Sequence, residues 1–166
     1  MSPRYDLPNA APEPLRQVQL LLNTTNVESG DDWLPDWLAE HGADGELERA
    51  RDLRDALRSL VLANNGFVLA GDALRVVNAE AERLTVRVDA ERRVQLDGGG
   101  DALAVVSAVA FGAMLDGTWG RLKACRNCHW SFYDNSPNRS ATWCSMQLCG
   151  NRTKTRAYRR RKTTSR

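Results

Sequence analysis

Apolar residues recur every three or four positions along most of the first half of the chain. This spacing predicts amphipathic helices, because it places the apolar side chains on one face of a 3.6-residue turn. Helices are expected over 15–22, 31–38, 46–64 and 72–83. In the longest of these, 46–64, charged residues that include Arg58 occupy the side opposite the apolar face.

Later segments show two other patterns. Residues 84–88 and 94–96 alternate apolar and polar side chains, which predicts a β-hairpin. Residues 102–115 are apolar nearly all round and follow Asp101, a residue type that caps helix N-termini. A helix of this kind usually lies at the centre of a core, and its other role would be a homodimer interface. We therefore predict an α+β fold, mainly α, in which an N-terminal helical domain carries one small β-hairpin.

The charge is divided unevenly along the chain. The net charge is only +2, but residues 1–120 contain 11 basic and 20 acidic residues, whereas residues 121–166 contain 12 basic residues and a single acid. All four cysteines also fall in the basic part. This difference in charge and chemistry predicts two modules, 1–120 and 121–166.

No stretch of the sequence has the length and hydropathy of a membrane span, which needs about 20 apolar residues. The first residues, MSPRYDLPNAAPEP, lack the apolar core of a signal peptide. We therefore expect a cytoplasmic protein that makes no contact with a membrane. In that compartment thiols stay reduced, so clustered cysteines are more often metal ligands than disulfides.

The cysteines have the spacing of a metal site. Cys125-x2-Cys128 is followed, after 15 residues, by Cys144-x4-Cys149. A CxxC turn places two sulfurs on one side of a zinc ion, and a second pair closes the tetrahedral shell. Four thiolates leave no position open for water, so we predict one structural Zn²⁺ ion. The spacing disfavours the alternatives, which are four unrelated buried thiols, two disulfides, or ligation by His129.

The segments between the ligands predict the shape of the second module. Residues 129–134 and 139–143 can form the two strands of a hairpin around a turn at 135–138. The last two ligands would then lie just before a helix and inside its first turns. A knuckle, a hairpin and a helix in this order predict a treble-clef-like zinc finger that ends in a basic helix.

The end of the chain is strongly basic. From residue 152 to residue 166 there are eight basic residues and no acid. The predicted nucleic-acid-binding residues are Arg152, Lys154, Arg156, Arg159, Arg160, Arg161 and Lys162. Such a density is typical of phosphate binding, although a solvated tail has the same composition. A metal-anchored helix would orient these side chains before binding, which favours the nucleic-acid interpretation.

Specific residues in this module match a known pattern. Cys149-Gly150-Asn151-Arg152, with the basic residues after it, resembles the CGNR zinc-finger family of bacteria, and Trp143-Cys144-Ser145 fits the same pattern. Leu22-Asn23-Thr24 resembles the LNT of the N-terminal domain that accompanies this finger, a domain described as a candidate stress-induced transcription regulator. The resemblance implies that the four cysteines bind zinc and that the protein regulates transcription by binding DNA at the nucleoid.

These patterns lead to one preferred function and two alternatives. The preferred function is a DNA-binding transcription regulator, which could be a homodimer and could respond to an unidentified small molecule in a pocket at Asn23 and Thr24. The alternatives are an RNA-binding module, in which aromatic residues of the finger stack on bases, and a protein-interaction module. The acidic part could also bind and mask the basic helix. We expect no enzyme, because the two histidines lie 88 residues apart and all the cysteines are assigned to the metal.

Overall fold

The computed structural model describes residues 9–155 of the 166-residue chain. In chain order its elements are α1 (Leu15–Leu22), α2 (Leu34–Glu40), η1 (Asp44–Glu46), α3 (Leu47–Ala63), α4 (Ala73–Ala81), β1 (Thr85–Val88), β2 (Val94–Asp97), α5 (Ala102–Leu115), η2 (Trp119–Arg121), β3 (Leu122–Ala124), β4 (Ser131–Tyr133) and η3 (Met146–Gly150). The predicted class is confirmed, since this part of the chain is mainly helical and holds two small antiparallel sheets and a cluster of four cysteines. Within residues 9–155, no helix has both the length and the hydropathy to cross a membrane.

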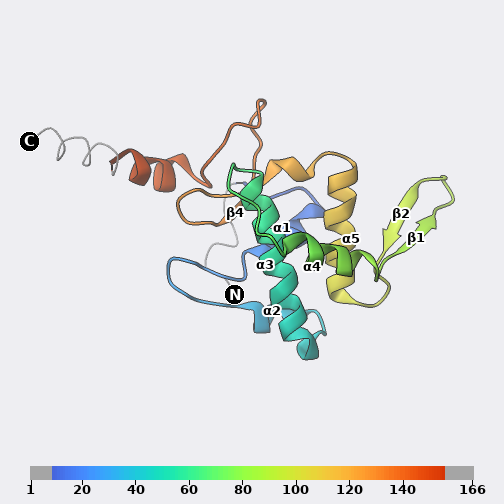
Figure 1. Cartoon of the computed structure of the whole chain (residues 1–166). Coiled ribbons are helices and arrows are strands. Elements are labelled where there is room, and N and C mark those ends of the chain that lie inside the picture. Colours follow the sequence, from blue (N-terminus) through green and yellow to red (C-terminus); the bar gives the residue numbers. More distant parts are fainter. Residues whose placement is uncertain (1–8, 156–166) are drawn as a thin grey trace, which may run out of the picture.

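α3 is the central helix of the fold and contacts α1, α2, α4 and β3 (Figure 1). Its apolar positions, among them Leu53 and Val61, are buried in the main core. α5 packs on α1 and α4, and Asp101 caps it by accepting hydrogen bonds from the N–H groups of Leu103 and Ala104. The sequence pattern therefore placed both helices correctly.

Arg58, one of the charged residues opposite the apolar face of α3, is buried. Arg58 is only 8% exposed, and its guanidinium has partners inside the fold. It donates hydrogen bonds to the carbonyl oxygens of Leu22, at 2.8 Å, and His129, at 3.2 Å. Burial lowers the pKa of Arg58, but the group remains a cation at neutral pH. A pattern of apolar and polar positions cannot show which charged side chain has buried carbonyl groups within reach.

β1 and β2 form the predicted hairpin, which projects from the body of the molecule (Figure 1). Thr85 pairs with Asp97, and Val88 pairs with Val94. At the base of the hairpin, Gly98 lies so close to α5 that a Cβ atom there would collide with the backbone of Ala104. Glycine therefore allows the close approach that fixes the hairpin against α5.

The second sheet differs from the predicted hairpin of the zinc finger. β4 lies within the predicted strand 129–134, but it pairs with β3, with Leu122 opposite Tyr133 and Ala124 opposite Ser131. The predicted return strand over 139–143 is wrong. That segment instead forms a loop whose carbonyl groups accept hydrogen bonds from side chains, so its backbone needs no partner strand.

Candidate metal centre and basic helix

β3 and β4 hold the first pair of cysteines at a tight turn. The Cys125 N–H donates to the carbonyl of Trp130 at 2.9 Å, and the His129 N–H donates to the carbonyl of Cys125 at 2.9 Å. His129 has φ of 57°, in the left-handed region that few residues other than glycine adopt. The turn thereby brings the sulfurs of Cys125 and Cys128 together, as a CxxC metal knuckle requires.

The four cysteine sulfurs form a compact, buried group. The Sγ atom of Cys128 lies 3.7 Å from that of Cys144 and 3.6 Å from that of Cys149, and the last two are 3.7 Å apart. All four sulfurs lie within 4.8 Å of one another. A tetrahedral zinc site with Zn–S bonds of about 2.3 Å has sulfur–sulfur edges of about 3.8 Å. The cysteines are free and too far apart for disulfides, and their geometry fits one structural zinc ion.

The charges of this group also favour a divalent cation. Hydrogen bonds from the thiols of Cys128 and Cys144 lower the pKa of Cys125, whereas the bond to Cys125 raises the pKa of Cys128 to about 12 and also raises that of Cys144. Four thiols this close cannot all ionise readily on their own, and a cation at their centre would let all four do so. When bound, zinc would crosslink the chain through four thiolates, a closed shell that leaves no position for substrate. The ring of His129 lies apart from the sulfurs and packs edge-on against Phe67, with ring centroids 5.6 Å apart.

A buried ion pair organises the loop between the two cysteine pairs. Lys123 Nζ lies 2.7 Å from Asp134 Oδ2, and the exposed fractions of the two side chains are 7% and 0%. Lys123 also donates to the carbonyl groups of Arg139 and Ala141. Burial alone would raise the pKa of Asp134, but hydrogen bonds from Lys123 and Ser136 outweigh it and lower the pKa to about 2. Both charges are thus paired, which offsets the cost of burying them.

Asn23 fastens α1 to the zinc finger. Its Nδ2 donates to the carbonyl of Ser131 at 2.9 Å, and its Oδ1 accepts from the N–H of Ser131 at 2.8 Å. Gln19, one turn earlier, donates to the same carbonyl at 3.1 Å. Thr24 is buried beside them and accepts a hydrogen bond from Arg54 at 3.2 Å. The side chains of Asn23 and Thr24 are therefore engaged within the fold, and neither lines a groove of about 1020 Å³ or another of about 650 Å³ in the described part of the chain.

Asn65 makes a similar connection from the end of α3. Its Nδ2 donates to the carbonyl groups of Ala124, at 2.7 Å, and Thr142, at 2.9 Å, while its own carbonyl accepts from Arg126 at 2.8 Å. These contacts tie the helical module to both sides of the cysteine loop. The role of Asn65 could not be predicted from the sequence, because an asparagine after a helix indicates a helix end and carries no separate signal for a distant partner.

The second pair of cysteines belongs to a helix, as predicted. Cys144 precedes it, and Ser145 caps it, since its Oγ accepts from the N–H of Leu148 at 3.3 Å. η3 contains Cys149, and the helix continues through residue 155. A zinc ion bound by Cys144 and Cys149 would therefore fix the start of the helix.

Arg152 and Lys154 lie exposed on this helix, shortly after Cys149. Arg152 is near the acidic module, with its Nη1 3.4 Å from Glu28 Oε1, and both side chains are more than a third exposed. The other predicted nucleic-acid-binding residues lie outside the described residues; they are Arg156, Arg159, Arg160, Arg161 and Lys162.

The aromatic residues of the finger serve as its small core. Trp130 and Phe132 are buried against the four cysteines, and Trp143 is partly buried beside them. Tyr133 is buried in the main core, together with Leu122 of β3. The finger and the helices therefore share apolar packing as well as hydrogen bonds.

Two family models match the chain and together cover most of it. The model described as "Putative stress-induced transcription regulator" (ABATE) matches residues 17–117, and the model described as "CGNR zinc finger" matches residues 121–162. No curated protein matches the chain significantly. Since the first match spans more than half of the chain, the protein belongs to the ABATE family, and a CGNR zinc finger follows its ABATE domain.

Proposed function

We propose that this transcription regulator uses its zinc finger to present a basic helix to duplex DNA. The observation that supports the proposal best is the position of Arg152 and Lys154, which are exposed on the helix that contains the ligand Cys149. A metal crosslink at the start of a helix limits how the side chains beyond it can move, so less entropy is lost when they bind. Lys and Arg on such a helix would neutralise phosphates and release counterions.

The rest of the basic segment extends the same charge. Eight basic residues and no acid occupy 152–166, and Arg156, Arg159, Arg160, Arg161 and Lys162 complete the proposed contact set. In this division, residues 121–166 bind DNA, residues 1–120 regulate that binding, and neither module is an enzyme. DNA binding would place the protein at the nucleoid, in the cytoplasm.

The contact between Arg152 and Glu28 does not compete strongly with this role. Exposed ion pairs contribute about 0–1 kcal/mol, so a DNA phosphate can replace Glu28 as the partner of Arg152.

The same contact is a place where the acidic module, residues 1–120, could mask the helix. Deletion of residues 1–120 is not a clean test of masking, because Asn23, Asn65 and Arg58 hold the finger in place. Glu28→Gln removes the charge alone and should raise DNA affinity slightly if masking occurs.

Duplex DNA is a better candidate than single-stranded RNA. Proteins that read single-stranded RNA stack its bases on exposed aromatic rings. In this finger Trp130, Phe132 and Tyr133 are all buried, so these rings offer no stacking surface. A protein-interaction role for the finger would not require the accumulation of positive charge after Cys149.

A salt titration of DNA binding tests the proposed function. The zinc-loaded full chain is compared with Arg152→Ala/Lys154→Ala and with a control, Arg75→Ala/Arg92→Ala, which removes two exposed arginines from the other module. The slope of log K against log salt should become shallower by about 2 in the first variant, because each phosphate contact contributes about one unit. It should not change in the control.

Two results would contradict the mechanism. One is a duplex-DNA affinity that barely changes between low and moderate salt, because phosphate neutralisation would then not be its basis. The other is an equal loss of slope in both variants, because the helix would then have no special part. Single-stranded RNA as a competitor checks the alternative, and it should displace duplex DNA poorly.

A further inference from the structure

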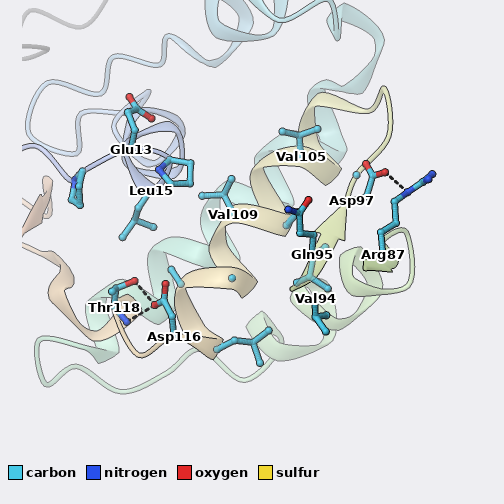
Figure 2. Close-up of a pocket in the computed structure, with 18 residues that line it drawn as sticks. Glu13, Leu15, Arg87, Val94, Gln95, Asp97, Val105, Val109, Asp116 and Thr118 are labelled. Atoms are coloured by element: carbon cyan, nitrogen blue, oxygen red, sulfur yellow. Dashed lines mark hydrogen bonds and ion pairs between the residues drawn. The ribbon is translucent and has the colours of Figure 1, made fainter. Parts of the chain in front are cut away.

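A groove of about 1020 Å³ lies over the outward face of α5, beside the start of α1 (Figure 2). Its floor contains Val105, Ala108, Val109 and Gly112, which recur at helical spacing. β2 forms one wall, and the chain around Pro14 and the start of α1 forms the other. Its volume is at the upper end of the range for small-molecule sites, about 300–1,000 Å³.

The groove is hollow because of two small residues in its floor. Ala108 fills little space, and a Cβ atom built on Gly112 would meet nothing within 4 Å. The wall formed by β2 is held in place, because Gly98 packs directly on the backbone of α5. The shape of the groove therefore depends on the backbone and on the small size of residues 108 and 112. Larger side chains at these two positions would fill it.

The lining combines apolar side chains with negative charge. Among the described residues of the lining, Glu13, Asp97 and Asp116 contribute three carboxylates and Arg87 contributes one cation, which gives these residues a net charge of −2. Arg87 is already engaged with Asp97, at 2.5 Å, on the hairpin side. Glu13 and Asp116 lie on the side of Leu15, away from that pair (Figure 2).

Asp116 stays ionised at neutral pH. Its Oδ1 accepts hydrogen bonds from the Thr118 hydroxyl, at 2.6 Å, and the Thr118 N–H, at 2.8 Å, and these bonds lower the pKa of Asp116 (Figure 2). The side chain is therefore a fixed negative charge at the end of an apolar floor. It can attract a cation and repels an anion.

Other ligand classes fit the lining less well. The net negative charge opposes phosphates and carboxylates. The lining residues within 9–155 include no aromatic side chain, so this part of the chain offers no aromatic cage in which ring faces would bind a cation. The one cluster of possible metal ligands found within residues 9–155 is the four cysteines, which lie elsewhere.

We propose that the groove binds an amphipathic organic cation, whose hydrocarbon part lies on Val105, Val109 and Gly112 and whose amine lies beside Asp116. The charge of the lining complements the amine, and the floor complements the hydrocarbon. Such a site belongs to the helical module and requires no DNA.

The position of the groove suits an effector site. Leu15 lines the groove, and Gln19, one turn further along α1, donates a hydrogen bond to Ser131 of the finger. A ligand that contacts Leu15 can thus influence the orientation of the finger through α1. This effect on DNA binding rests on the proposed function, whereas binding of the cation does not.

Binding is tested with the zinc-loaded full chain and three single-chain amphiphiles of equal length, used below the concentrations at which they form micelles. Dodecylammonium, dodecanol and dodecanoate share a twelve-carbon skeleton, and their head groups are cationic, neutral and anionic in turn. Titration calorimetry should show that dodecylammonium binds at least about tenfold more tightly than dodecanoate, because opposite and like charges face the same carboxylates. Dodecanol should lie between them.

Two kinds of variant locate the site. Ala108→Leu fills the floor and should weaken dodecylammonium binding at least about tenfold, whereas Ala79→Leu adds the same side chain to an exposed position of α4 and should change nothing. Gly112→Leu is a second filling variant, in case Ala108→Leu fails to fold. Glu13→Gln/Asp116→Asn keeps the shape and should weaken binding about two- to fivefold.

Several results would overturn the assignment. Equal binding of dodecanoate would exclude the charge argument, and full binding by both filling variants would place the ligand elsewhere. If dodecylammonium does not bind and sedimentation shows a dimer that Ala108→Leu dissociates, the groove is an interface with a second copy. None of these results affects the salt titration with DNA, so failure of the cation site and failure of the proposed function are distinguishable.

Discussion

The two antiparallel sheets of this protein have the same local topology but opposite environments. β1 and β2 are four residues long, and most of their side chains lie in solvent. β3 and β4 are only three residues long, yet every residue in them is buried. Two-stranded sheets are marginally stable alone, so each must be held by something other than its own strand pairing.

The ion pairs of the two sheets show the difference most directly. In the exposed hairpin, Arg87 pairs with Asp97 at 2.5 Å, with side chains 69% and 36% exposed. Beside the buried sheet, Lys123 pairs with Asp134 at 2.7 Å, with side chains 7% and 0% exposed. The distances are similar, but water screens the first pair and is excluded from the second. The surroundings of a contact, more than its geometry, therefore decide how much its loss costs.

Metal removal should separate the two sheets most strongly. Without zinc, or in Cys128→Ser, the amides of β3 and β4 should lose their protection from hydrogen exchange, while the exchange of β1 and β2 should not change. The expected effect is large, because structural zinc contributes about 10–16 kcal/mol of apparent binding free energy in small fingers. Hydrogen exchange followed by mass spectrometry measures both sheets in one sample.

Zinc added back after chelation is the control, and it should restore protection in the wild-type chain and not in Cys128→Ser. Unchanged protection of β3 and β4 without metal would mean that Asn23, Asn65 and the aromatic core hold the sheet without the ion. The difference between the two sheets would then come from burial and not from the metal.

Loss of one partner of the buried ion pair should have the next largest effect. Lys123→Met leaves the Asp134 carboxylate buried without its cation, and this should lower the free energy of unfolding by about 3–5 kcal/mol. Urea unfolding of the zinc-loaded protein measures it. The double variant Lys123→Met/Asp134→Leu should recover much of the loss, because no unpaired charge remains. A double variant as unstable as the single one would show that the other hydrogen bonds of Asp134 and Lys123 matter more than the charge.

The same contrast explains what the sequence could predict. The exposed hairpin and α5 follow from local patterns, namely an alternation of period two and a capping Asp101 before an apolar run. The four cysteines follow from their spacing, because metal chemistry fixes how ligands must be separated. In each case the information lies within a few residues or within one chemical type.

The buried sheet could not be predicted in this way. The partner of β4 was placed at 139–143 because a neighbouring segment is the simplest partner, whereas the protein pairs β4 with β3 and uses Lys123 to hold the loop. Asn23 and Arg58 likewise act on residues far away in the chain. Such side-chain to backbone contacts depend on the complete fold and leave no periodic signal.

Removal of the Asn23 contact should have an intermediate effect. Asn23→Ala deprives the buried N–H of Ser131 of its acceptor, while Gln19 still donates to the Ser131 carbonyl. An unpaired buried group costs about 1–3 kcal/mol, which urea unfolding can resolve. Asn78→Ala, on the exposed side of α4, is the matched control and should change stability by less than about 0.5 kcal/mol. Equal effects would mean that the hydrogen bonds between Asn23 and Ser131 add no stability beyond that of packing.

The smallest effect should come from the exposed ion pair. Arg87→Met removes the cation that faces Asp97, and the unfolding free energy should fall by no more than about 1 kcal/mol, because both groups remain hydrated. The difference from wild type should also shrink as salt is added, since screening weakens exposed pairs. A loss as large as that of Lys123→Met would mean that the hairpin is buried in solution, and the nearest available surface is a second copy of the chain. Sedimentation of wild type and Arg87→Met at several concentrations would then distinguish a dimer from a monomer whose hairpin depends on this ion pair.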